Sequence, residues 1–129
     1  YLDIANYVTV CYGHMDPKID RNKTYTIEEC KNILATDLAK HTINVLSCAP
    51  KLAEDINSLA AWTQFDFNVG SFCSTKFSTM NKARLLIANG SIKASCAQMS
   101  SWVYAGGKVA NGLVKRRARE RALCERQAA

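Results

Sequence analysis

The sequence predicts a single α+β fold, mainly helical, made of a small β-containing lobe, a long connecting helix and a helical lobe. Three observations predict it: a β-branched and aromatic run near the start, a helix-capping sequence at residue 26, and apolar residues that recur at three- and four-residue steps afterwards. We expect the β-containing lobe at residues 1–25, the connecting helix at 26–48 and the helical lobe at 49–129. A chain of 129 residues is too short for two large domains.

The first two elements are predicted by local patterns. The run Tyr7–Tyr12, Tyr-Val-Thr-Val-Cys-Tyr, predicts a strand that is closed by a glycine. After polar residues 15–25, Thr26 and Glu29 form a capping box: the hydroxyl accepts from the Glu29 amide while the carboxylate reaches back. A helix of about five turns should follow and end before Pro50.

Four further helices are predicted in the rest of the chain. A nearly all-round apolar helix, typical of a buried central helix, follows and ends at Gly70. A third helix runs from about residue 74 through 86 and stops at Asn89-Gly90. Ser91 can cap a fourth helix, which carries Ile92, Cys96, Met99 and Trp102. The loop 105–108 precedes a last helix over about 112–125.

The charge balance predicts an anionic partner. Lys and Arg number 17 and Asp and Glu 11, which gives a formal net charge of +6. The basic run 115–121 is typical of a phosphate-binding helix or of a solvated helix with i,i+4 pairs such as Arg121 with Glu125. We favour the solvated helix, because no nucleic-acid motif accompanies the run, and we expect no nucleic-acid partner.

Common cofactor and membrane signatures are absent from the sequence. It contains no phosphate loop, no dinucleotide fingerprint and no H-E-x-x-H zinc motif, so we expect no cofactor and no metal. The longest aliphatic run, residues 85–88, is far shorter than the roughly 20 residues of a membrane helix, so we expect no membrane span in this chain.

The cysteines predict an oxidising compartment. They form no C-x-x-C motif and have no nearby histidine pair, which disfavours zinc. An even number of widely spaced cysteines predicts three disulfides in a periplasmic or exported protein, and buried free thiols are the alternative. Sequence alone cannot choose the pairing. We expect two bonds between cysteines that are neighbours in the sequence and a third bond between the two cysteines that remain. The expected bonds are Cys11–Cys30, Cys73–Cys96 and Cys48–Cys124.

Asp3 and Thr9 are the candidate catalytic residues. With a tight turn between them, the carboxylate and the hydroxyl would face each other across a hairpin. Such a pair can hold and deprotonate one water, as attack on a sugar acetal carbon from the far side of the ring requires. The alternative is that Asp3 lies in a turn and Thr9 on a strand without catalytic roles, and the spacing alone favours this alternative. We interpret His14 and His41 as structural, and discount His41 because it falls on a charged helix face.

Several motifs in the same order resemble the phage-type lysozymes, the endolysins of T-even and lambdoid bacteriophages. Residues 1–14 are similar to the catalytic hairpin of that family. The wide spread of cysteines resembles the exported branch, and the resemblance covers nearly the whole chain. The further matching segments are residues 25–30, 65–70, 72–75, 102–108 and 112–124.

The resemblance implies a lysozyme-like fold and a monomeric muramidase. Its substrate would be the β-1,4 bond between N-acetylmuramic acid and N-acetylglucosamine in bacterial peptidoglycan, cut in the host periplasm to cause lysis. By the family motif Glu-x8-Asp-x5-Thr, Asp3 would position the water and Thr9 would be its hydroxyl partner. A small secreted interaction protein that uses the basic last helix is a rival interpretation.

The family motif places its general-acid Glu upstream of Tyr1. We therefore expect the sequence to be a truncated form that is inactive alone, and the complete product to carry the Glu and an export segment or anchor. A degenerate relative that binds peptidoglycan without cutting it is the alternative.

The resemblance also implies roles outside the hairpin. Asn68 would line the glycan cleft and hydrogen-bond a sugar, unless it only caps the helix before Gly70. His14 would be the structural histidine of the hairpin. An arginine of the last helix would pair with the catalytic Glu, with Arg116 and Arg117 as the candidates.

Overall fold

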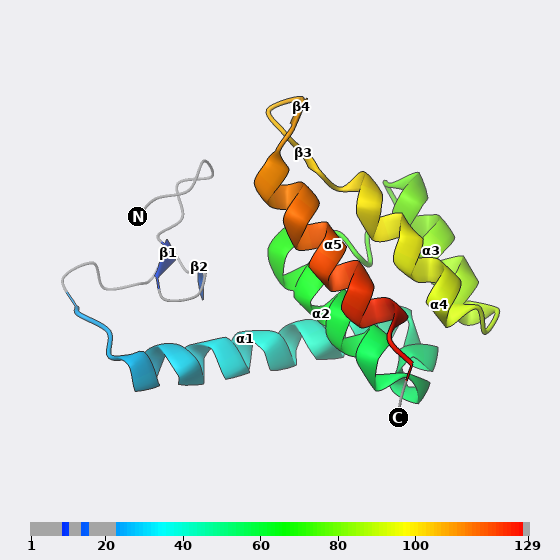
Figure 1. The fold of residues 1–129 in the computed structure, drawn as a ribbon. Coiled ribbons are helices and arrows are strands. Elements are labelled where there is room, and N and C mark those ends of the chain that lie inside the picture. Colours follow the sequence, from blue (N-terminus) through cyan, green and yellow to red (C-terminus); the bar gives the residue numbers. More distant parts are fainter. Residues whose placement is uncertain (1–8, 11–13, 16–22, 128–129) are drawn as a thin grey trace. The chain divides into compact units, whose positions relative to one another are not determined.

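The computed structural model describes residues 9–10, 14–15 and 23–127. The chain forms two compact units, residues 1–40 and residues 41–129. The predicted mainly helical α+β class is confirmed (Figure 1). In chain order the elements are β1 (Thr9–Val10), β2 (His14–Met15), α1 (Ile27–Cys48), the 3₁₀ helix η1 (Pro50–Glu54), α2 (Ile56–Val69), α3 (Ser78–Ala88), α4 (Ile92–Ser95), the 3₁₀ helix η2 (Cys96–Ser101), β3 (Tyr104–Ala105), β4 (Lys108–Val109) and α5 (Asn111–Glu125).

The first unit contains an antiparallel pair of short strands. In this pair the Cα partners are Thr9 with Met15 and Val10 with His14. The strand expected over residues 7–12 is confirmed at its two described positions, and the remainder of that range lies outside the described residues.

The predicted capping box is present at the start of α1. The Thr26 amide donates to Glu29 Oε1 at 3.2 Å, and the Glu29 amide donates to Thr26 Oγ1 at 3.1 Å. Lys23 adds an ion pair to the same carboxylate at 2.6 Å. The Lys23 ammonium, and after it the Thr26 amide, lower the pKa of Glu29. The helix ends at Cys48, shortly before Pro50, as the sequence predicts.

The second unit is built around α2. Its start is capped by Asp55, whose side chain accepts from the Ser58 amide at 3.1 Å. Its end is the left-handed Gly70 at φ 76°, a conformation that other residues adopt only with strain. The side chains of Trp62 and Phe65 are fully buried, which confirms the predicted central helix.

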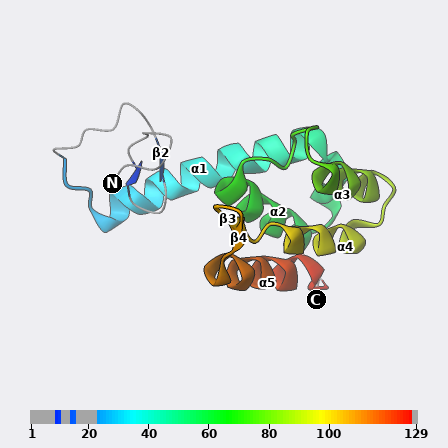
Figure 2. The same cartoon turned by 90° about the horizontal axis from the view of Figure 1, so that it is seen from above.

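The core around this helix also takes buried side chains from the end of α1, α3, η2 and α5. α5 lies alongside α2 and η2, and α3 packs against α4 and η2 (Figures 1 and 2). The Trp62 ring contacts Phe65 edge-on at 5.1 Å and Phe72 at 4.8 Å, and its Nε1 donates to Ser95 Oγ at 3.1 Å. The buried indole N–H of Trp62 is therefore satisfied.

Hydrogen bonds to Asp66 connect the second half of α1 to α2. This carboxylate is 1% exposed and receives three donors. His41 Nδ1 lies 2.7 Å and Asn44 Nδ2 3.1 Å from its Oδ2, and the Phe72 amide donates to Oδ1 at 3.3 Å. His41 therefore has a buried partner that the sequence did not suggest, 25 residues away.

The disulfide pairing differs from the expectation. The structure contains Cys48–Cys73 and Cys96–Cys124, so the expected Cys73–Cys96 and Cys48–Cys124 bonds are wrong. The first bond joins the last turn of α1 to the segment before α3, and the second joins η2 to α5. Pairing of sequence neighbours fails because helix packing decides which cysteines meet.

The remaining expected bond, Cys11–Cys30, stays a prediction. Cys30 is disulfide-bonded, whereas Cys11 lies outside the described residues.

Lys93 on α4 closes the carboxyl end of α5. Its ammonium donates to the carbonyl oxygens of Cys124 and Arg126 at 2.9 and 2.7 Å, and to Ser58 Oγ at 3.2 Å. It also forms an ion pair with Asp55 at 2.9 Å. Lys93 therefore connects α4 to the start of α2 and to the end of α5, where the last carbonyl groups of a helix lack partners within the helix.

A hairpin stands where the sequence predicts only a loop. Strands β3 and β4 pair antiparallel, Tyr104 with Val109 and Ala105 with Lys108. The turn residues Gly106 and Gly107 have φ angles of 60° and 78°, which suits a tight two-residue hairpin connection. The fourth helix is also shorter than expected, because it continues as η2, and the Ser91 side chain makes no capping bond.

Within the described residues, no helix combines the length and apolar character that crossing a membrane requires.

Candidate functional site

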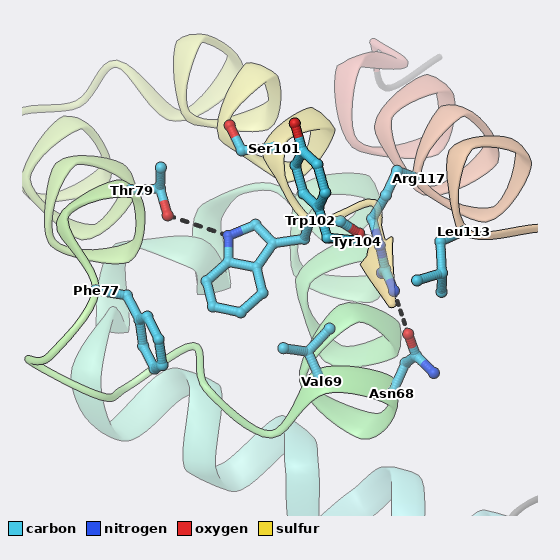
Figure 3. Close-up of a pocket in the computed structure, with 9 residues that line it drawn as sticks. All are labelled: Asn68, Val69, Phe77, Thr79, Ser101, Trp102, Tyr104, Leu113 and Arg117. Carbon is cyan, nitrogen blue, oxygen red and sulfur yellow. Dashed lines mark hydrogen bonds between the residues drawn. The ribbon is translucent and has the colours of Figure 1, made fainter. Parts of the chain in front are cut away.

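A pocket of about 570 Å³ opens in the second unit, beside the carboxyl end of α2. Its wall comes from α2, the start of α3, the end of η2, β3 and α5 (Figure 3). The lining is mostly apolar with a few polar groups, as is usual for small-molecule sites. The lining residues are Asn68, Val69, Phe77, Thr79, Ser101, Trp102, Tyr104, Leu113 and Arg117.

Trp102 is the largest side chain of this pocket and has a fixed orientation. Its Nε1 donates to Thr79 Oγ1 at 3.1 Å, as Figure 3 shows. The ring contacts Phe77 at 5.0 Å and Phe65 at 5.8 Å, both edge-on. A held indole in a partly open pocket offers a flat apolar surface to a ligand.

Arg117 is buried behind the pocket and organises its polar corner. The side chain is 2% exposed, and its guanidinium lies 5.0 Å from the centre of the Phe65 ring. Nε donates to the Trp102 carbonyl oxygen at 2.9 Å, Nη1 to Glu120 and Nη2 to Asn68 Oδ1. Burial lowers the pKa of Arg117, an effect that the nearby Glu120 carboxylate opposes.

Glu120 is the acidic partner of both candidate arginines. It is 3% exposed, pairs with Arg117 and lies 3.3 Å from Arg116 Nε. Burying a charged group costs free energy unless an opposite charge lies beside it. Glu120 therefore allows the guanidinium of Arg117 to be buried here. Arg116 is 38% exposed and lies at the rim of this cluster.

Asn68 is the predicted binding residue that the structure places in the pocket wall. Its Oδ1 accepts from Arg117, so the amide group is oriented, and the residue is exposed (Figure 3). Nδ2 makes no hydrogen bond with any described residue and is available as a donor. The alternative role as a helix cap is filled by Gly70, whose amide donates to the Asp66 carbonyl oxygen at 2.7 Å.

The predicted catalytic pair cannot be located as side chains. Asp3 lies outside the described residues. Thr9 and His14 are placed only as strand positions of the β1–β2 pair. Their roles therefore stay predictions.

Sequence reasoning missed most of the pocket. The segment 102–108 was recognised as a motif without a role, yet Trp102 and Tyr104 line the pocket. Phe77 carried no signal. Among the described residues no cluster of metal-ligating side chains occurs.

The comparison with known proteins concerns nearly the whole chain. The family model for phage lysozyme matches residues 1–120. The SAR-endolysin of Bacteriophage PS119 is 40% identical over 128 residues, covering 96% of this chain and 71% of the relative. The SAR-endolysin of Enterobacteria phage PA-2 is 39% identical over 126 residues, covering 96% and 72%.

A solved structure gives the same result for the fold. The active form of P1 phage endolysin Lyz superposes with a TM-score of 0.78 at 19% identity, covering 96% of this chain and 73% of that one. The lysozyme-like architecture expected from the resemblance is thereby confirmed. The chain belongs to the phage lysozyme family.

Proposed function

We propose that this chain is the lysozyme domain of a phage endolysin that acts on peptidoglycan in the host periplasm. The reaction would be hydrolysis of the β-1,4 bond between N-acetylmuramic acid and N-acetylglucosamine. Membership of the phage lysozyme family and the relatives named SAR-endolysin support this proposal. The observation that carries it is the pocket of the second unit, where an oriented amide stands beside a held indole.

The pocket suits a sugar ring with an acetamido group. The faces of pyranose rings are apolar C–H surfaces that pack on aromatic rings, and Trp102 offers such a ring. The acetamido carbonyl oxygen is a hydrogen-bond acceptor, and Asn68 Nδ2 is a donor available for it. Arg117 acts through Asn68 and is a positioning residue in this proposal.

In this proposal the water is activated by Asp3 and Thr9. The carboxylate accepts the proton of a water that the hydroxyl helps to hold, and the water oxygen bonds to the anomeric carbon as the glycosidic C–O bond breaks. The leaving sugar oxygen takes its proton from the general-acid Glu of the family motif. The antiparallel pairing of Thr9 with Met15 supports the assignment, because it gives Thr9 a fixed place on a strand. His14, opposite Val10, would stabilise the same hairpin.

Arg116 is the better candidate for the arginine that the resemblance pairs with the general acid. Arg117 already uses all three guanidinium nitrogens within its own cluster. Arg116 uses only Nε among the described contacts, and it is more exposed.

The test is product analysis with purified sacculi. The protein that carries these residues should release muropeptides with reducing N-acetylmuramic acid ends, identified by mass spectrometry after borohydride reduction. Asp3→Asn and Thr9→Ala should each lower the rate by about a hundredfold or more. Exclusive 1,6-anhydro products, reducing N-acetylglucosamine ends, or unchanged rates in both variants would contradict the assigned chemistry.

The pocket is tested separately by affinity. Asn68→Ala should raise KM for glycan fragments by about tenfold, the cost of roughly one hydrogen bond. Gln64→Ala provides the matched control, because Gln64 is an exposed amide on the same helix outside the pocket lining. Equal KM values for the two variants would remove Asn68 from the site. Binding of glycan without any hydrolysis would favour a non-catalytic relative.

A further inference from the structure

The charges of the second unit are strongly segregated along the chain. Residues 67–119 contain nine of the 17 Lys and Arg residues and none of the 11 Asp and Glu residues. The two acids that follow, Glu120 and Glu125, are both paired with arginines of α5. Three of the nine cations are paired with acids outside the segment, Lys93 with Asp55 and both Arg116 and Arg117 with Glu120. The other six have no acidic partner among the described residues, so the segment keeps an excess of positive charge.

The exposed apolar side chains fall in the same segment. Five of the eight exposed large hydrophobic residues among the described ones lie within it. Single exposed apolar residues are normal on a protein surface, whereas a contiguous group of them indicates an interaction surface. The five are Phe77, Leu85, Tyr104, Val109 and Val114.

Three of these five gather at the β3–β4 hairpin and the start of α5. We call Tyr104, Lys108, Val109, Val114 and Lys115 the hairpin patch. The three apolar members are 63%, 55% and 41% exposed in chain order, and both lysines are exposed.

Backbone pairing keeps the members of the patch close together. Tyr104 and Val109 are Cα partners across the hairpin and share one face, and Lys108, which precedes Val109, lies on the opposite face of the same narrow hairpin. The Val114 amide donates to the Ala110 carbonyl oxygen at 3.0 Å, which joins the hairpin to α5. In Figure 1 this hairpin projects at one end of the helices of its unit.

We propose that the hairpin patch docks on the surface of an anionic lipid bilayer. Lysines attract the negative headgroups, Tyr104 is amphipathic as interfacial aromatics are, and the two valines reach the boundary of the acyl chains. A hydrated wall polymer would satisfy the lysines but would leave the valines exposed. The proposal goes beyond the glycan site, because only Tyr104 also lines the pocket, whereas Val109, Val114 and the two lysines lie outside its lining.

Co-sedimentation with lipid vesicles tests the proposal. The vesicles are phosphatidylethanolamine alone or phosphatidylethanolamine with one quarter phosphatidylglycerol, at low and at physiological salt. We expect binding only to the anionic vesicles, weakened by salt. Lys108→Gln with Lys115→Gln should lower the partition coefficient by about fivefold per cation at low salt.

A second pair of variants separates the apolar contribution from the charge. Val109→Ser with Val114→Ser should lower the partition coefficient several-fold without changing its dependence on salt. Matched controls are Lys51→Gln and Ile56→Ser, because Lys51 is exposed and Ile56 is 68% exposed, both outside the patch. Circular dichroism melting establishes that each variant is folded.

Three results would overturn the proposal. They are equal binding to both kinds of vesicle, patch variants that bind as the controls do, and patch variants that lose binding to purified sacculi but keep binding to vesicles. The last result would assign the patch to the cell wall. Vesicle binding and glycan hydrolysis are measured separately, so failure of one leaves the other interpretable.

Discussion

Replacement of Glu120 by Gln should be among the most destabilising single changes of charge in the second unit. The side chains of Glu120 and Arg117 are 3% and 2% exposed, so the substitution leaves a buried guanidinium without its carboxylate. Loss of one partner from a buried ion pair costs about 3–5 kcal/mol. Because Gln keeps one oxygen acceptor, we expect about 3 kcal/mol, a large share of the total stability of a small domain.

Glu125→Gln is the matched control on the same helix. Its carboxylate is 44% exposed and pairs with Arg121 at 3.2 Å, the i,i+4 pair that the sequence predicts. An exposed pair contributes about 0.5 kcal/mol or less. The two variants make the same chemical change in α5, and mainly the burial of the pair differs.

Urea unfolding followed by tryptophan fluorescence, with the disulfides intact, measures both free energies of unfolding. The slope m should be the same for wild type and variants, so that the midpoints report stability alone. Arg117→Met combined with Glu120→Leu should recover part of the loss, because no unpaired charge then remains. If Glu120→Gln and Glu125→Gln lie within 0.5 kcal/mol of each other, about the usual error for such sites, the reasoning about burial is refuted.

Three further changes test other parts of the second unit. Burial acts to raise the pKa of Asp55, but the Lys93 ammonium and the Ser58 amide outweigh it, so the pKa is lowered from its ordinary value of 3.8. The ionised Asp55 therefore contributes stability at pH values above 3.8, and this contribution is lost as the pH falls through the lower pKa of the folded state. Asp55→Asn should make the free energy of unfolding depend less on pH below 3.8. An unchanged acid transition would contradict the assignment. Replacing both Cys96 and Cys124 by Ala should lower the free energy of unfolding by about 3 kcal/mol, measured by urea unfolding. Peptide mapping of the wild-type protein should recover the Cys96–Cys124 cross-link, and recovery of other pairs would contradict the structure. Gly70→Ala should cost about 1 kcal/mol in thermal unfolding because its φ is 76°, and a neutral result would exclude the left-handed cap.

Local patterns predicted the helices well. The capping box at Thr26 appears with both of its hydrogen bonds, and α1 ends before Pro50 as expected. These features depend on residues a few positions apart. The β3–β4 hairpin was missed because each strand has only two residues, too few to show an alternating pattern.

Contacts between distant residues could not be predicted. His41 and Asp66 are 25 residues apart, and Asn68 and Arg117 are 49 apart. Nothing in either local sequence indicates the partner, because the packing of α2 against α1 and α5 brings them together. The same packing decided the disulfides. Assignment of Asn68 to a site came from the resemblance, whereas its orienting arginine came from the structure.

The oxygen partners of Lys93 have a practical consequence for chemical labelling. Amine-directed reagents should modify exposed lysines such as Lys51 and Lys82 quickly, whereas at Lys93 they must first displace four oxygen-bearing partners. Acylation of Lys93 would thus report the opening of this corner of the second unit. Dyes or beads attached through the other surface amines would leave the carboxyl end of α5 undisturbed.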